Sequence, residues 1–238
     1  MEEKLSGIVL GGVNYGENDK ILKVFTLEQG TVSAKIKGVK KAGAKLRFAS
    51  EPFCFAEFIF SSTNKGKTVI GASLIDSFYT IRVDLIRYYC ATAVIEFLRR
   101  FELESIVNKD MFILTLDTLK KLAYGDEEPK SLLVKFLIQA LKLTGYSLNL
   151  SGCYKCGCEI EDKIYFDCYS GGFSCDECFE QDGREINYST YLALRQAEKG
   201  EELLEDGSVL ALRLLDFYLI NKTQEKLNSL KELLKITA

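Results

Sequence analysis

The sequence predicts an α+β protein in which five short strands, forming a small barrel or sandwich, precede a helical part with a cysteine-rich insert. Three observations predict this fold class. Short apolar and β-branched runs fill residues 1–80, apolar residues recur with the helical period after Asp76, and six of the eight cysteines lie between Cys153 and Cys178. The chain has 238 residues, which suits one large domain or two small ones.

The five predicted strands are separated by turn residues such as Gln29-Gly30. In one of them Val32, Ala34 and Ile36 alternate with polar residues, as expected for a strand with one buried face. Several short strands in so few residues fit a small barrel or sandwich. The predicted strands are Gly7–Val13, Ile21–Leu27, Thr31–Gly38, Phe53–Phe60 and Thr68–Ile75.

Helices are predicted after Asp76 because apolar residues recur there at intervals of three and four. Gly125 to Pro129 separates the second helix from the third, which we expect to end near Gly145. The expected domain segments are 1–80, 81–149, 150–182 and 183–238, the third being the cysteine insert. The predicted helical runs are Ile86 to Phe101, Phe112 to Leu122, Leu133 to Leu141, a stretch around Tyr191, and Val209 to Leu234.

Two C-x2-C pairs lie in the insert, Cys153 with Cys156 and Cys175 with Cys178, and 18 residues separate the pairs. Both thiolates of such a turn can face one ion, and two turns complete a tetrahedral sulfur cage, which suits Zn2+. A cage of four sulfurs has no open position. The expected cofactor is therefore one structural zinc ion that activates no water.

Four further cysteines are not needed for this cage. Cys158 and Cys168 are expected to be small buried residues, but either could replace a ligand, and an iron–sulfur cluster is another alternative. Cys54 and Cys90 lie in apolar patterns and are expected in the core. Disulfides are disfavoured, because the N-terminus lacks the features of an export signal.

Six basic residues fall within 13 residues, and no Asp or Glu occurs from Gln29 to Ser50. A basic strand and loop of this kind can follow phosphates without reading base sequence, although a solvated loop that only favours solubility is the alternative. Residues 1–80 carry a net charge of +3 and the remainder −6. The candidate DNA-binding residues are Lys35, Lys37, Lys40, Lys41, Lys45 and Arg47.

Histidine is absent from the chain, which excludes Ser-His and Cys-His catalytic pairs and histidine metal ligands. There is also no paired-carboxylate or nucleophile motif, so we expect no catalysis. No stretch reaches the roughly 18 apolar residues of a membrane span. We therefore expect a cytoplasmic protein without a membrane partner.

Several short motifs occur in order along the chain. Tyr15-Gly16-Glu17-Asn18-Asp19 follows an opening strand, and Lys37-Gly38-Val39-Lys40-Lys41 follows the third strand. Glu51-Pro52-Phe53 comes next. Leu143-Thr144-Gly145-Tyr146 then leads into the first cysteine pair, Gly171-Gly172-Phe173-Ser174 leads into the second, and Lys226 to Leu230 lies near the end. Together these motifs resemble the bacterial recombination mediator family RecO almost from end to end.

This resemblance implies an N-terminal OB-fold DNA-binding barrel, followed by an all-α helical domain with an inserted four-cysteine zinc finger. It also implies a non-enzymatic mediator of DNA repair and homologous recombination in the RecF pathway. Such a protein binds single- and double-stranded DNA, anneals complementary strands, and helps to load RecA onto DNA coated with single-strand DNA-binding protein (SSB). The implied partners are DNA, RecR, the C-terminal tail of SSB and, indirectly, RecA, and the implied location is the cytoplasm at the nucleoid.

Three alternatives remain open at this stage. A zinc-ribbon RNA-binding or transcription-associated module is the first, because a small barrel suits RNA as well. An enzyme with a structural zinc, such as a nuclease, is the second, and a protein adaptor with little DNA contact of its own is the third.

Overall fold

The computed structural model describes residues 2–64, 66–102, 104–180 and 183–237. The chain divides into two compact units, Met1–Val83 with Ile95–Ala123, and Asp84–Val94 with Tyr124–Ala238. Within the described residues, no helix is both long enough and apolar enough to cross a membrane. The four domain segments predicted above remain a proposal, and the boundary at residue 182 lies outside the described residues.

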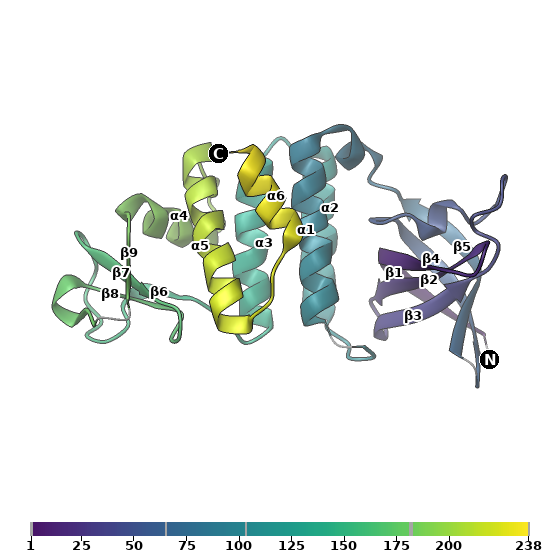
Figure 1. Ribbon diagram of the computed structural model, residues 1–238, viewed down its shortest axis with the longest axis horizontal. Helices are drawn as coiled ribbons and strands as arrows, with labels where there is room; N and C mark the ends of the chain where they lie inside the picture. Colours follow the sequence, from purple (N-terminus) through teal and green to yellow (C-terminus); the bar gives the residue numbers. More distant parts are fainter. Residues whose placement is uncertain (1, 65, 103, 181–182, 238) are drawn as a thin grey trace. The chain divides into compact units, whose positions relative to one another are not determined.

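Five strands form a closed barrel in the order β1-β2-β3-β5-β4, and β4 pairs back with β1 (Figure 1). Neighbouring strands are antiparallel except β3 and β5, which are parallel. This is the five-stranded Greek-key arrangement of the OB fold, so the predicted barrel is confirmed. The strands are β1 (Glu2–Tyr15), β2 (Asp19–Thr26), β3 (Gly30–Ile36), β4 (Phe55–Thr63) and β5 (Gly66–Asp76).

The barrel core follows the strand period. Val32, Ala34 and Ile36 are buried as predicted, because alternate side chains of a strand point to the same face. The fourth strand begins at Phe55 and not at Phe53. Phe53 has a φ of 70°, which lies outside the β region, so the pairing with β1 starts two residues later.

The first unit also contains α2 (Lys109–Tyr124) and the C-terminal half of α1 (Leu85–Phe101). The ring of Phe112 on α2 lies 5.5 Å from that of Phe25 and 6.2 Å from that of Phe55, measured between ring centroids. The amphipathic face of α2 therefore extends the apolar packing of the barrel within this unit.

Four helices dominate the second unit, in which α3 and α5 pack side by side (Figure 1). The third helix begins at Pro129 and ends at Leu143, shortly before Gly145 with a φ of 83°, as predicted. The run predicted from Val209 to Leu234 is two helices, because Gln224 adopts a left-handed conformation with φ 60° and ends the first of them. The helices are α3 (Pro129–Leu143), α4 (Tyr188–Glu198), α5 (Glu205–Thr223) and α6 (Asn228–Ile236).

A sheet of four short strands, which the sequence did not predict, lies in the cysteine-rich region. Its order is β6-β8-β7-β9. Phe166 and Phe173 from this sheet pack against Tyr218 of α5 and Tyr191 of α4, at 5.7 and 4.9 Å between ring centroids. The insert therefore shares a core with two helices. The strands are β6 (Asn149–Cys153), β7 (Ile164–Asp167), β8 (Gly172–Ser174) and β9 (Arg184–Ile186).

Candidate metal centre and nucleic-acid interface

The two C-x2-C pairs start from neighbouring strand ends. Cys153 is the last residue of β6, and Cys175 directly follows β8. Because β6 and β8 are parallel neighbours, their C-terminal ends lie together, and both turns start from the same end of the sheet. Backbone hydrogen bonds close the turns: the Gly157 N–H donates to the Cys153 carbonyl at 2.8 Å, and the Cys178 N–H donates to the Cys175 carbonyl at 3.2 Å.

The spacing of the sulfurs fits a metal ion. The Sγ atoms of Cys153, Cys156, Cys175 and Cys178 all lie within 4.8 Å of one another, and those of Cys156 and Cys175 are 3.9 Å apart. Tetrahedral zinc with Zn–S bonds of about 2.3 Å requires sulfurs about 3.8 Å apart, whereas a disulfide bond is about 2.0 Å long. All eight cysteines are free. The four close cysteines could therefore hold one metal ion.

The clustered thiols influence one another's ionisation. Burial raises the pKa of Cys153, but the N–H groups of Cys156, Cys175 and Lys155 stabilise its thiolate and bring the pKa to about 6. The hydrogen bond between Cys178 and Cys156 raises the pKa of Cys178 to about 12. Neighbouring thiolates repel one another, so four of them can be ionised together only around a positive ion.

The other four cysteines fall into two classes. Cys54 and Cys90 are buried in the core, as predicted. Cys158 was predicted to be buried and is instead exposed; it follows the turn at residues 154–156 and Gly157, which has a φ of 77°. Its contacts with the side chains of Cys156 and Cys175 raise its pKa to about 12. Cys168 is partly exposed and does not belong to the group.

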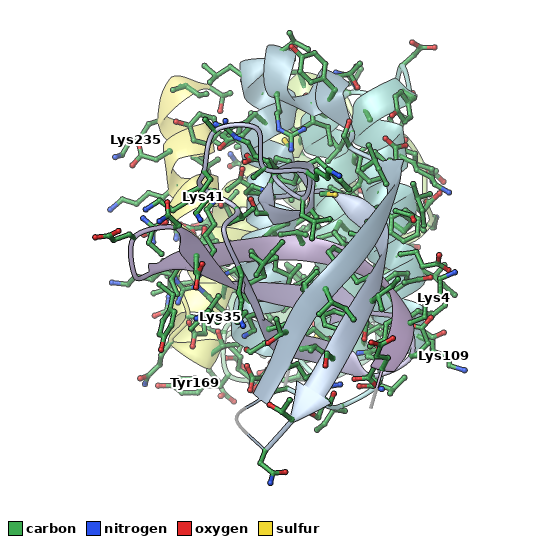
Figure 2. All side chains as sticks on the ribbon, turned by 90° about the vertical axis from the view of Figure 1, so that its right-hand side faces the viewer. Lys4, Lys35, Lys41, Lys109, Tyr169 and Lys235 are labelled. Carbon is green, nitrogen blue, oxygen red and sulfur yellow. The ribbon has the colours of Figure 1, made fainter. Side chains whose placement is uncertain are left out.

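The candidate DNA-binding residues lie on β3 and in the loop that follows it. Lys35 is half-buried, and the other five are exposed, namely Lys37, Lys40, Lys41, Lys45 and Arg47. Within the described part of the chain, these five make no ion pair shorter than 4.0 Å. In Figure 2, Lys35 and Lys41 lie on one side of the barrel, and Lys4, which is paired with Glu57, lies on the other. The loop therefore presents unpaired positive charge.

Apolar side chains hold this loop on the barrel. Val39 is buried in the barrel core, and Leu46 and Phe48 pack against the same core. Successive turns follow one another along the loop, in which the N–H groups of Lys41, Ala44 and Arg47 each donate to the carbonyl three residues earlier, at 3.1 to 3.2 Å. The lysines are thus carried on an ordered segment. A charged surface that is ordered before binding loses less entropy when it meets its partner.

Asp19 ties the loop to the turn between β1 and β2, a role that the sequence did not reveal. Its Oδ1 accepts the Gly38 N–H at 2.8 Å, and its Oδ2 lies 2.9 Å from the Lys35 ammonium. The Gly38 N–H, and then Lys35, lower the pKa of Asp19. Lys35 therefore differs from the other five candidates, because its charge is already paired.

Comparison with known proteins covers both units. The family model described as "Recombination protein O N terminal" matches residues 1–78, and the model described as "Recombination protein O C terminal" matches residues 82–231. The chain belongs to the RecO family. The first RecO match contains the basic loop, and the second contains all four clustered cysteines.

Curated RecO proteins are similar over most of the chain. The "DNA repair protein RecO" of Desulforamulus reducens is 30% identical over 233 residues, which cover 92% of this chain and 90% of that protein. The protein of the same name from Acetivibrio thermocellus is 33% identical over 186 residues, covering 78% and 74%. That of Bacillus subtilis is 31% identical over 188 residues, covering 78% and 72%. The resemblance seen in the motifs is confirmed.

Proposed function

We propose that this RecO-family protein mediates DNA repair and homologous recombination by binding single- and double-stranded DNA and annealing complementary strands. Membership of the RecO family supports a role in DNA repair and recombination. The observation that carries the DNA-binding part is the ordered loop on the OB barrel, on which Lys37, Lys40, Lys41, Lys45 and Arg47 are exposed and unpaired.

The mechanism is electrostatic. Cations on one loop neutralise phosphates on two strands, which lowers the repulsion between the strands so that they can pair. Each phosphate contact releases counterions, so binding weakens as salt rises. Five contacts to single-stranded DNA predict a slope of about −3.5 for the logarithm of the binding constant against the logarithm of salt concentration. No covalent step is needed, and the protein acts without catalysis.

The cysteine group would hold one structural Zn2+ through Cys153, Cys156, Cys175 and Cys178. Four thiolates leave no open coordination position, and zinc is the common ion in such sites. When bound, the ion cross-links the turns after β6 and β8. The chain's own residues prepare the ligands, because backbone N–H groups stabilise the Cys153 thiolate and the sheet fixes both turns.

Membership of the RecO family supports a proposal for the protein partners. The protein would act with RecR, would bind the C-terminal tail of SSB, and would help RecA to load onto SSB-coated DNA. Its proposed location is the cytoplasm, at the nucleoid.

Reversing three loop charges tests the proposal. Changing Lys37, Lys40 and Lys41 to Glu should slow annealing of complementary oligonucleotides by about 100-fold or more, because phosphates are then repelled where they were attracted. Annealing is measured by fluorescence energy transfer between labelled strands, with and without SSB, and zinc content is measured on the same protein.

The matched control changes Lys120, Lys199 and Lys226 to Glu. These lysines are also exposed, and the change in net charge is the same, but they lie outside the loop. The control should anneal as the wild type does. Equal annealing by both variants would show that the loop has no part in the mechanism. A separate binding measurement on the wild type tests the RNA-binding alternative, which tighter binding of RNA than of DNA would favour.

A further inference from the structure

We propose that Tyr15 stacks on an unpaired nucleobase, which lies in the open cavity beside the basic loop. This inference rests on the proposed function and deepens it, because it assigns a base-binding position and a preference for single strands. The phosphate contacts proposed above do not distinguish single strands from duplexes, whereas an aromatic ring against a base does.

The cavity is built from two neighbouring segments of the first unit. It has a volume of about 580 Å3 and is open to solvent. One wall is the turn from Tyr15 to Asp19, and the other is the end of β3 with the start of the loop, including Lys37 and Lys41. Tyr15 is the last residue of β1, and 51% of it is exposed. A large aromatic side chain thus lies unburied at the rim of a cavity lined by lysines.

Lys35 fixes the position of this ring. Its ammonium lies 4.4 Å from the centroid of the Tyr15 ring and 2.9 Å from Asp19 Oδ2. Asp19 is itself held by the Gly38 N–H. The cation therefore covers one face of the ring, where it is attracted to the π electrons. The exposed remainder of the ring is kept in place for a second planar group, and the entropy lost on stacking is small.

The charges around the cavity suit a nucleotide better than a free anion. Lys37 and Lys41 supply positive charge for a phosphate on the loop side. Asp19 and Glu17 line the side of the turn, where they disfavour an anion. A nucleotide satisfies both halves, since its phosphate can lie toward the lysines while its neutral base lies over Tyr15. In the interior of a duplex both faces of each base are already stacked, so there only an unpaired base can stack on Tyr15.

The test compares Tyr15→Leu, which removes the ring, with Tyr15→Phe, which retains it. The probes are an oligo-dT strand, an abasic strand of the same length, and a duplex. Tyr15→Leu should bind oligo-dT about 5- to 100-fold more weakly than the wild type. Its affinity for the abasic strand and the duplex should stay within about twofold, because the lysines are intact. Tyr15→Phe should bind all three probes as the wild type does.

Two results would overturn the assignment of Tyr15: unchanged oligo-dT binding by Tyr15→Leu, or an equal loss on oligo-dT and the abasic strand. Wild-type binding to all three probes would persist in either case, so the proposed function would stand. Wild-type protein that binds none of the probes would overturn both. A second measurement needs no variant: photocrosslinking of the wild type to an oligo-dT strand carrying 5-iodouracil should label Tyr15. Labelling only at other residues would contradict the proposal.

Discussion

At the scale of single residues, the cysteines outside the four-cysteine group show that the position of a thiol decides whether it could hold the metal. Cys158 is exposed, and its carbonyl accepts the Cys153 N–H at 2.9 Å, so its backbone supports the first turn. Its sulfur is not among the four that lie within 4.8 Å of one another. Cys168 is also outside this group. Neither side chain is needed to complete a tetrahedral sulfur site.

We therefore expect Cys158→Ser and Cys168→Ser to retain about one zinc ion per chain, while Cys175→Ser loses most of it, because three thiolates hold zinc less tightly than four. Zinc is measured by mass spectrometry of the freshly purified proteins. Cys158 would be a ligand if Cys158→Ser lost its zinc while a serine substitution at one of the four clustered cysteines retained it.

The sequence predicted which cysteines come together, because C-x2-C spacing is a local property of a turn. It did not predict that Lys35 is paired. Asp19 and Lys35 meet because β2 and β3 are neighbours in register, where Lys20 pairs with Ile36. Such a contact depends on strand pairing, and spacing along the chain does not reveal it. For the same reason, the sequence did not reveal that Tyr15 is exposed.

At the scale of elements, the turn between β2 and β3 depends on a glycine. Gly30 has a φ of 67°, and the segment after α1 approaches it closely. A Cβ atom at Gly30 would lie 2.0 Å from the carbonyl oxygen of Ile106. The Ser105 N–H donates to the Thr31 carbonyl at 3.1 Å, so this segment is bound to the start of β3. A side chain at Gly30 would force the two apart.

Gly30→Ala should lower the free energy of unfolding by about 3 kcal/mol or more, from the left-handed backbone and the clash together. The measurement is guanidinium unfolding followed by circular dichroism. Gly43→Ala is the matched control, because Gly43 has a φ of 73° but nothing lies within 4 Å of its added Cβ. It should cost only about 1 kcal/mol. Equal effects of the two substitutions would contradict the close approach at Gly30.

Whether the sequence predicted a strand depended on the length of that strand. The five barrel strands have 7 to 14 residues, enough for alternation to be recognised. Strands β7, β8 and β9 have three or four residues and lie among glycines and cysteines, so no period is visible. The break between α5 and α6 was missed because Gln224 is not a residue type that favours the left-handed conformation.

At the scale of the whole molecule, the basic loop and the four-cysteine group lie in different parts of the chain. The net charge is −3, but residues 1–80 carry +3. The basic loop lies in the first compact unit, and the four-cysteine group lies in the second. Since each unit has buried residues of its own, the proposed DNA-binding surface need not depend on the metal for its structure. Cys153 is the last residue of β6, Cys175 directly follows β8, and this sheet packs on α4 and α5.

Removal of the metal should therefore affect one unit. Structural zinc contributes on the order of 10 kcal/mol to the folding of small sites, so a chelator should release the turns and loosen the sheet around them. Hydrogen–deuterium exchange should show lost protection in peptides from β6 to β9, and unchanged protection in peptides from β1 to β5. The double variant Cys153→Ser/Cys156→Ser should give the same pattern without chelator. Equal loss of protection in the barrel would mean that the metal stabilises the whole chain, and full protection of β6 to β9 would mean that the cysteine site is not structural.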